Sequence, residues 1–157
     1  MSERFAGRTF RFSSTFTLEA PRNEVHAVLV DLEFYADWWP QVRAVAKIDD
    51  DHALVVCRST LPYDLELHLS AVSRDLDLLE VGIDGPIRGW ARYHLDEQGP
   101  GVTTLRFEQE VRAEAPSFVV ASYVAKPLLV WNHHRMMLGA DRGLRERFQP
   151  SAATAAS

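Results

Sequence analysis

Cysteine is almost absent from this sequence, because Cys57 is the only one in 157 residues. A single cysteine excludes an internal disulfide and a thiolate cluster for zinc. Cys57 is therefore interpreted as a small buried hydrophobic side chain, with a reactive thiol as the alternative. The motifs of phosphate-binding loops, zinc proteases and redox dithiols are also missing. No metal or cofactor is expected.

Long apolar runs and dense basic runs are missing as well. No apolar stretch approaches the roughly 20 residues that cross a bilayer, so membrane insertion is not expected. Residues 1–11 lack the apolar centre of a signal peptide, which makes the cytoplasm the expected location. The formal net charge of −5, without a Lys/Arg run, excludes the basic face that duplex nucleic acid requires.

The composition is that of a globular protein, with 46% apolar and 25% charged residues. A chain of this length buries roughly two-thirds of its unfolded surface, which is enough for one core. We predict one domain over residues 8–148, with flexible termini at 1–7 and 149–157. A monomer and a homodimer are both compatible with these observations.

The first part of the chain predicts a strand followed by two short helices. Residues 8–19 alternate between apolar and polar side chains, as in a half-buried strand. After Pro21, apolar residues recur with helical spacing at Val25, Val28, Leu29 and Leu32. The aromatic segment 34–40 ends at Pro40 and predicts a helical turn packed against the end of a sheet.

The middle of the chain has a period close to 2, interrupted by turn residues. Six further strands are predicted, at 42–48, 53–61, 64–73, 78–84, 87–96 and 102–113. No helical segment separates them, so they form an antiparallel meander with one apolar face.

The C-terminal part returns to helical spacing. Pro127 divides a short segment starting at Ser117 from a long helix over 127–148. Its predicted apolar face consists of Leu129, Val130, Met136, Met137, Ala140, Leu144 and Phe148. The sheet offers the only apolar surface large enough to cover this face. The order of elements predicts an α+β helix-grip fold, in which a curved antiparallel sheet of about seven strands surrounds the long C-terminal helix.

Three stretches resemble the START-like SRPBCC superfamily, in particular its polyketide cyclase/dehydrase-like branch. Residues 10–40 contain Ala20-Pro21 before an amphipathic helix, then an aspartate and a tyrosine followed by Trp38-Trp39-Pro40. Residues 89–107, with a Gly-Pro-Gly turn, are similar to that family's late strand pair, and residues 132–148 to its terminal helix.

The resemblance implies a pocket for a hydrophobic small molecule. The family includes lipid carriers, plant allergen-type ligand binders, coenzyme Q-binding proteins and polyketide aromatase/cyclases, and it has no universal catalytic residue to carry over. Its late strand often has an inward Trp after the glycine. Here Ala91 takes that place and Trp90 points outward, which implies a roomier pocket or a shifted register.

A few polar residues fall in inward-facing positions: His133 on the apolar helix face, Tyr93 and Gln109 on their strands, and Cys57 with Ser59. An unsatisfied buried polar group costs about 1–3 kcal/mol, so these groups must meet each other, water or ligand. His133 either bonds a backbone carbonyl or Tyr93 as a core residue, or it contacts the ligand. Its ordinary pKa of about 6.5 would also suit proton transfer.

Other residues have two open interpretations. Met136 and Met137 suit the core or an adaptable apolar ligand, and Trp38 with Trp39 either form the pocket mouth or fix the short helix to the sheet. The run 49–51 is interpreted as a solvated turn rather than a metal site. The predicted ligand-binding residues are Trp39, Cys57, Ser59, Leu67, Val81, Tyr93, Phe107, Gln109, His133, Met136 and Met137.

Three functions follow. The first is binding of a lipid, quinone or polyketide-like molecule as a carrier or sensor. The second is a cyclase or dehydratase in which His133 and Tyr93 act as acid and base, which requires both side chains to converge on one open cavity. The third is a protein-interaction role like that of ribosome-associated or respiratory-chain relatives, which an exposed apolar patch near Trp38 and Trp39 would support.

Overall fold

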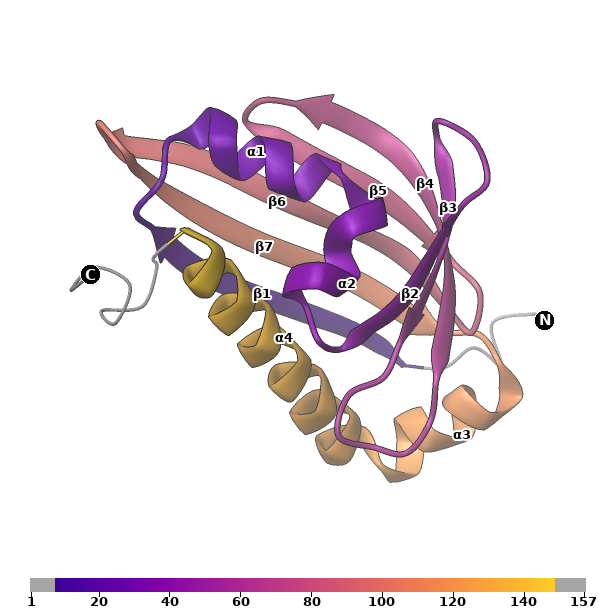
Figure 1. Cartoon of the computed structure of the whole chain (residues 1–157). Helices are drawn as coiled ribbons and strands as arrows, with labels where there is room; N and C mark the ends of the chain where they lie inside the picture. The colour runs from indigo at the N-terminus through magenta and orange to yellow at the C-terminus, as the bar shows by residue number, and fades with distance from the viewer. Residues whose placement is uncertain (1–7, 149–157) are drawn as a thin grey trace.

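A computed structural model describes residues 8–148 and shows a strongly curved sheet that holds a long helix in its concave side (Figure 1). The predictions for residues 1–7 and 149–157 lie outside the described residues. The elements in chain order are β1 (Thr9–Leu18), α1 (Arg22–Val30), η2 (Leu32–Phe34), α2 (Tyr35–Trp38), β2 (Val42–Lys47), β3 (His52–Cys57), β4 (Leu65–Asp75), β5 (Leu78–Asp84), β6 (Ile87–Gly99), β7 (Val102–Ala113), α3 (Pro116–Val124) and α4 (Lys126–Phe148).

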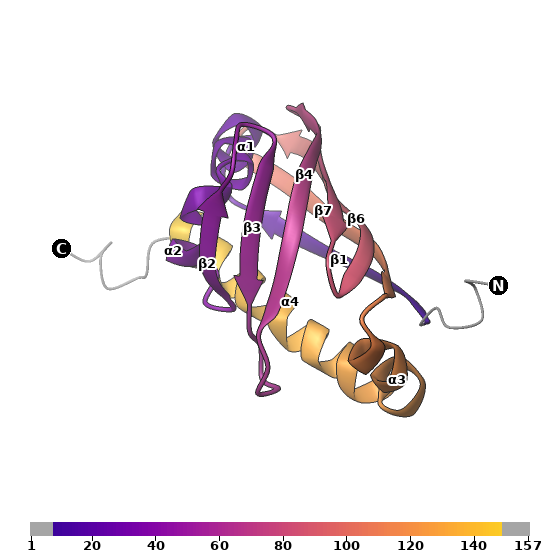
Figure 2. The ribbon, with the colours of Figure 1, turned by 90° about the vertical axis from the view of Figure 1, so that its right-hand side faces the viewer.

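The seven strands form one antiparallel sheet in the order β1-β7-β6-β5-β4-β3-β2, which confirms the predicted helix-grip architecture. Each strand from β2 to β7 lies beside its neighbour in sequence, whereas β1 closes the far edge against β7 (Figure 2). Register shifts occur between Val42 and Ala44 in β2 and between Ala71 and Ser73 in β4. Such bulges increase local twist and bend the strand, which helps the sheet to wrap around the helix.

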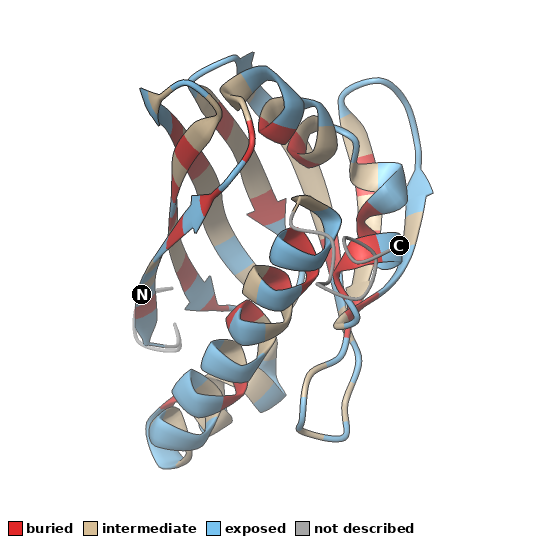
Figure 3. Ribbon diagram, turned by 60° about the vertical axis from the view of Figure 1, so that its left-hand side comes forward, coloured by how far each residue is buried: buried red, intermediate tan, exposed pale blue. Residues whose placement is uncertain are grey.

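The alternation in the sequence sets the two faces of the sheet. In β1 Phe10, Phe16 and Leu18 are buried, while their odd-numbered neighbours are exposed. In β6 the inward register of Ala91 and the outward register of Trp90 are confirmed, since the Trp90 ring packs under the Arg92 guanidinium at 3.7 Å. The concave face is therefore apolar and the convex face polar. Figure 3 shows how buried and exposed residues are distributed along the strands.

The predicted strand 53–61 is too long, because β3 ends at Cys57. Beyond it the Arg58 amide donates to the Gln41 carbonyl, and the Leu61 amide donates to the Asn132 side chain. These bonds hold the backbone in a loop that faces α4 instead of the next strand. The alternation continues past Cys57 in the sequence, so it could not indicate where sheet pairing stops.

Helix α4 crosses the concave face and buries Asn132, Met137, Ala140, Gly143 and Leu144 (Figure 3). Val130, predicted on the same face, is exposed instead, because its neighbour Leu129 takes the inward position and successive residues of a helix differ by about 100° in direction. Gly143 packs directly on α2, where a β-carbon would lie 1.7 Å from the Trp38 carbonyl oxygen. In the described part of the chain no helix has the length and apolarity to cross a membrane.

Candidate functional site

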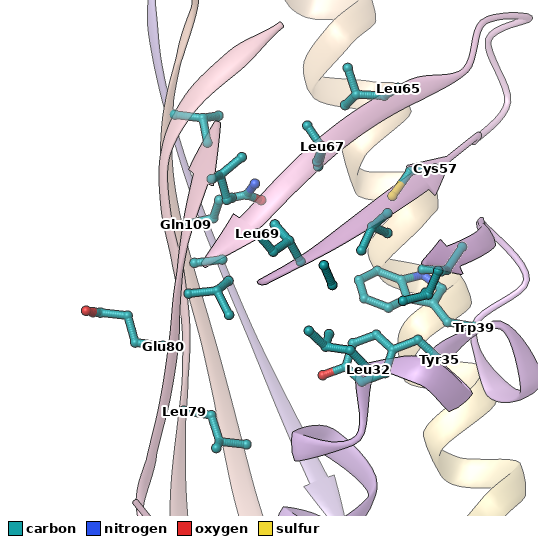
Figure 4. Close-up of a pocket in the computed structure, with 18 of the residues that line it drawn as sticks. Leu32, Tyr35, Trp39, Cys57, Leu65, Leu67, Leu69, Leu79, Glu80 and Gln109 are labelled. Atoms are coloured by element: carbon teal, nitrogen blue, oxygen red, sulfur yellow. The ribbon is translucent and has the colours of Figure 1, made fainter. Parts of the chain in front are cut away.

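The space between the concave face and the helices is a cavity of about 550 Å³. All seven strands contribute to its walls, α4 closes one side, and η2 with α2 lies over the other. Figure 4 shows that Leu65, Leu67, Leu69 and Leu79 surround it with aliphatic carbon, while Tyr35 and Trp39 enter from the helical side. The cavity exists because the inward apolar side chains of the curved sheet and those of α4 do not meet across it.

Most of the residues predicted from the sequence line this one cavity. They are Trp39, Cys57, Leu67, Val81, Tyr93, Phe107, Gln109, His133, Met136 and Met137. Ser59 is not among the cavity residues, because it follows the end of β3 and donates its hydroxyl to the Asn132 carbonyl at 2.9 Å. Ser59 thus faces α4 but lies outside the cavity lining. Contact of the other residues with a ligand stays a prediction.

His133 contributes the central polar group of the cavity. Its Nε2 lies 2.7 Å from Oε1 of Gln109, so Nε2 carries the proton and donates to the amide oxygen. The expected partners, a backbone carbonyl or Tyr93, were wrong, because Gln109 on β7 lies opposite this turn of α4. Burial lowers the pKa of His133 to about 4, with a smaller contribution from His134, so the ring is neutral near pH 7.

Two phenylalanines hold the His133 ring in place. The Phe12 ring from β1 stacks on it at 3.5 Å between centroids, nearly parallel at 10°. The Phe107 ring from β7 lies at 6.3 Å with an interplanar angle of 24°. Imidazole, amide and two aromatic rings thus form a rigid group with one defined tautomer at the wall of an apolar cavity.

Tyr93 belongs to a separate hydrogen-bonded chain. Its hydroxyl bonds that of Tyr35, and the Tyr35 hydroxyl donates to the Leu29 carbonyl. Since Tyr35 gives its only proton to Leu29, Tyr93 acts as the donor to Tyr35. Burial raises the pKa of both phenols above their ordinary value, so both stay protonated.

The two predicted acid/base residues therefore have different partners. The Phe107 ring lies against Tyr93, at 5.3 Å between centroids, as well as against His133. Tyr35 is a cavity residue that the candidate set omitted. Its position in the aromatic segment 34–40 could have indicated that Tyr35 lies near the site. Its contact with Tyr93 joins residues far apart in the chain, and no sequence pattern predicts it.

Trp38 and Trp39 resolve into two roles. Trp39 lines the cavity and also donates from Nε1 to the Met136 carbonyl of α4 at 3.0 Å. Trp38 stacks on Trp39 and packs α2 against Gly143. Both are about 5% exposed, so the apolar surface patch that would support a protein-interaction role at these residues is not present.

The cavity has two ends with different chemistry. Tyr63, Phe118 and Asn132 line one end, and the Asn132 amide connects α4 to the β3–β4 loop through Leu61 and Tyr63. Asn132 was not predicted, although a buried amide beside His133 is a polar signal of the same kind. The other end carries the β2–β3 turn, where residues 49–51 form the predicted solvated turn.

The remaining chemistry of the lining is limited. Burial raises the pKa of the Cys57 thiol to about 12, which removes the thiolate form that reacts or binds metal. Within residues 8–148, no three His, Cys, Asp or Glu side chains come together as metal ligands. Charged side chains line the end at the β2–β3 turn, among them Lys47 and Arg74. Away from that end the cavity offers apolar surface and a few oriented neutral hydrogen-bonding groups.

Comparison with known proteins gives the fold its name. No protein-family model matches the chain, and no curated protein matches it by sequence. Among solved structures the chain has the helix-grip fold of START-like proteins, as the resemblance in the sequence implied.

Three of these structures illustrate the likeness. A START superfamily protein from Mycobacterium smegmatis is 14% identical with a TM-score of 0.72, covering 88% of this chain and 97% of its own. The Zhui aromatase/cyclase from a Streptomyces species is 13% identical with a TM-score of 0.75, covering 93% and 98%. Norcoclaurine synthase from Thalictrum flavum, in complex with dopamine and hydroxybenzaldehyde, is 14% identical with a TM-score of 0.64, covering 96% and 92%. At these identities the likeness shows the fold alone.

Proposed function

We propose that this protein binds a hydrophobic small molecule in the cavity between sheet and α4, as a carrier or sensor. The observation that supports this most directly is the cavity itself. Its volume of about 550 Å³ lies within the range of roughly 300–1,000 Å³ that is typical of small-molecule sites. A domain of this size packs its core closely, so an apolar space this large is a feature of function rather than of stability.

The polar groups of the lining indicate the class of ligand. His133 is paired with Gln109 and Tyr93 with Tyr35, so few polar atoms are left to be satisfied by a ligand. A mainly apolar molecule with one or two carbonyl or hydroxyl groups fits this arrangement, because the Gln109 amide and the His133 ring are neutral hydrogen-bonding groups. Lipids, quinones and polyketide-like molecules have this chemistry.

Native mass spectrometry of protein purified from its own cells tests the proposal. We expect a discrete adduct of a hydrophobic molecule that organic solvent extracts. Ala91→Trp projects an indole from β6 into the cavity and should remove the adduct, while Val72→Trp, on an exposed site of β4, should retain it. Ala91→Trp carrying the same adduct as the unchanged protein would contradict binding in this cavity.

A second candidate is a cyclase or dehydratase, and the neutral His133 ring held by Gln109 is the observation that favours it. His133 would exchange a proton with a polyketide-like substrate, and the protonated Tyr93 would donate a hydrogen bond or a proton. The Zhui aromatase/cyclase, with the same fold, makes this chemistry a reasonable comparison.

The two candidates differ in what His133→Gln does to the extracted molecule. A carrier releases the same compound from the variant and from the unchanged protein. A dehydratase variant retains a compound that is heavier by one water, because the step that expels water is lost. An identical mass from both proteins would reject dehydration by His133. A cyclisation without loss of water leaves the mass unchanged, so identical fragmentation spectra as well would reject catalysis by His133.

A further inference from the structure

A second apolar surface lies outside the cavity, on the helices that close one of its ends. Five large side chains of α3 and the first turns of α4 are exposed, and we name them the elbow stripe. They are Val120, Tyr123, Val124, Leu128 and Trp131, between 44% and 78% exposed. Val120 and Val124 lie one turn apart on α3, and Leu128 and Trp131 lie one turn apart on α4. The two helices meet at Ala125, so the exposed side chains lie on both sides of this junction.

The charge around the elbow stripe is one-sided. Residues 115–140 contain no Asp or Glu, although the chain has 22 acidic residues. The cations near it are Arg8, whose guanidinium lies 5.1 Å from the centre of the Tyr123 ring, and Lys126, the first residue of α4, whose ammonium lies 5.7 Å from the centre of the Phe10 ring. Arg135 follows one turn beyond Trp131. An acidic protein therefore presents an apolar surface with a basic rim along α3 and the first turns of α4.

We propose that the elbow stripe docks on the surface of a bilayer that contains anionic phospholipid. An exposed apolar helix face with aromatic and basic residues at its border is the pattern of helices that lie in a membrane interface. Val124 and Leu128 enter the acyl boundary, Tyr123 and Trp131 lie at headgroup level, and the rim cations meet lipid phosphates. The protein docks on the membrane and does not span it.

Charge distinguishes this occupant from a second copy of the chain. In a two-fold dimer the same patch meets itself, so Lys126 and Arg135 of both copies would approach each other without an acidic group from residues 115–140 between them. That arrangement is repulsive, whereas an anionic bilayer supplies the opposite charge.

The position of the elbow stripe connects docking to the cavity. Phe118, on α3, lines the cavity and contacts the Tyr63 ring edge-on at 5.4 Å. Figure 2 shows α3 beside the N-terminal start of α4. A protein docked through α3 would hold this end of the cavity at the acyl boundary, where a hydrophobic molecule can enter or leave. The entry or exit of ligand at the membrane rests on the proposed ligand binding, whereas the docking itself does not.

Co-sedimentation with vesicles tests the proposal. The full chain should bind vesicles of phosphatidylcholine mixed with an equal amount of phosphatidylglycerol, and bind weakly to phosphatidylcholine alone. Val124→Glu should lower the partition coefficient by about tenfold or more, because it removes an inserted side chain and adds a negative charge. The matched control is Val72→Glu, since Val72 is 62% exposed on β4 and carries the same change of charge away from the stripe.

Three outcomes would overturn the docking surface. They are no binding to either vesicle, equal binding by Val124→Glu and Val72→Glu, and a concentration-dependent dimer in sedimentation that Val124→Glu abolishes. Brominated lipid gives an independent readout, because it should quench the fluorescence of Trp131 in the docked protein. The quenching should be smaller in Trp131→Phe, which lacks this fluorophore. Ala91→Trp should bind vesicles normally, so a failure of ligand binding and a failure of docking give different results.

Discussion

His133 shows how a single buried ring sets the behaviour of the site. It sits on α4 between Phe12 and Phe107, with Gln109 as its hydrogen-bond partner. Water is largely replaced by aromatic carbon around it, so the charged form of the ring is disfavoured. The histidine is consequently a donor of fixed direction near pH 7, and not a cation.

The lowered pKa of His133 predicts a loss of stability in mild acid. The folded-state pKa is about 4, whereas an unfolded histidine has a pKa of about 6.5. Below about pH 6.5 the unfolded chain binds a proton that the folded chain does not, so the free energy of unfolding falls until about pH 4, by up to about 3 kcal/mol in total. Urea unfolding of His133→Gln between pH 7 and pH 4 should lack this part of the fall.

The control for that prediction is His134→Gln, the exposed neighbour. It should keep most of the fall, because burial contributes more than His134 to the lowered pKa of His133. Parallel stability profiles of the unchanged protein and His133→Gln would show that His133 is not protonated preferentially in the unfolded state.

Cys57 gives a second prediction at the residue scale. Burial raises its pKa from 9.0 to about 12, which lowers the thiolate fraction at pH 8 by about a thousandfold. A water-soluble aromatic disulfide reagent should therefore react about a thousandfold more slowly with the folded protein than with the protein in guanidinium chloride. Equal rates would mean that Cys57 is accessible and is not the inert cavity residue described above.

For single residues, the sequence predicts which face a side chain lies on but not which side chain it pairs with. Alternation in β6 and β7 was enough to place Tyr93 and Gln109 on the inward face, and Trp90 on the outward face. Helical spacing placed His133 toward the sheet. Which pairs form depends on how the strands and α4 align in space, so the pair of His133 with Gln109 and that of Tyr93 with Tyr35 could not be predicted.

At the scale of elements, the contact of α4 with α2 and with the segment that follows α2 depends on two glycines with different neighbours. At Gly143 an added β-carbon would meet the backbone carbonyl of Trp38 at 1.7 Å, which cannot move without shifting α2. At Gly139 it would meet only the side-chain amide of Gln41, which can rotate away. The two sites lie one turn apart on the same helix.

Substitution by alanine should separate these two glycines. Gly143→Ala should lower the free energy of unfolding by about 1–3 kcal/mol through overpacking. Gly139→Ala should remain within about 1 kcal/mol of the unchanged protein, because the gain in helix propensity offsets the displacement of Gln41. Chemical denaturation measures both, and equal destabilisation by the two variants would contradict the rigid contact at Trp38.

Element boundaries were predicted well where turn residues interrupt the alternation of apolar and polar residues. They were predicted poorly where a tertiary contact ends the strand. The turn with Gly85 and Pro86 separates β5 and β6 as predicted, because Gly85 has a φ of 129° that other residues rarely adopt. The end of β3 at Cys57 was missed, since Asn132, in a helix far along the chain, holds the loop that follows.

At the scale of the whole molecule, the cavity leaves the protein without part of the packing that a filled core would have. A hydrophobic ligand that binds only the folded state should stabilise it with the logarithm of the ligand concentration, by about 2.7 kcal/mol at one hundred times its dissociation constant. Thermal unfolding with the extracted molecule should show a rising midpoint for the unchanged protein. Ala91→Trp is the control and should show none.

The closure of the sheet by β1 against β7 also has a consequence in time. Phe10 pairs with Val111, and Phe16 with Leu105. The first strand to be synthesised, β1, can therefore pair only after the last strand, β7, has been synthesised. At a synthesis rate of roughly 5–20 residues per second, β1 spends on the order of 5–20 s on the ribosome without its partner. During that interval its phenylalanines have no sheet to join, and the newly made N-terminal segment is a natural client for a chaperone.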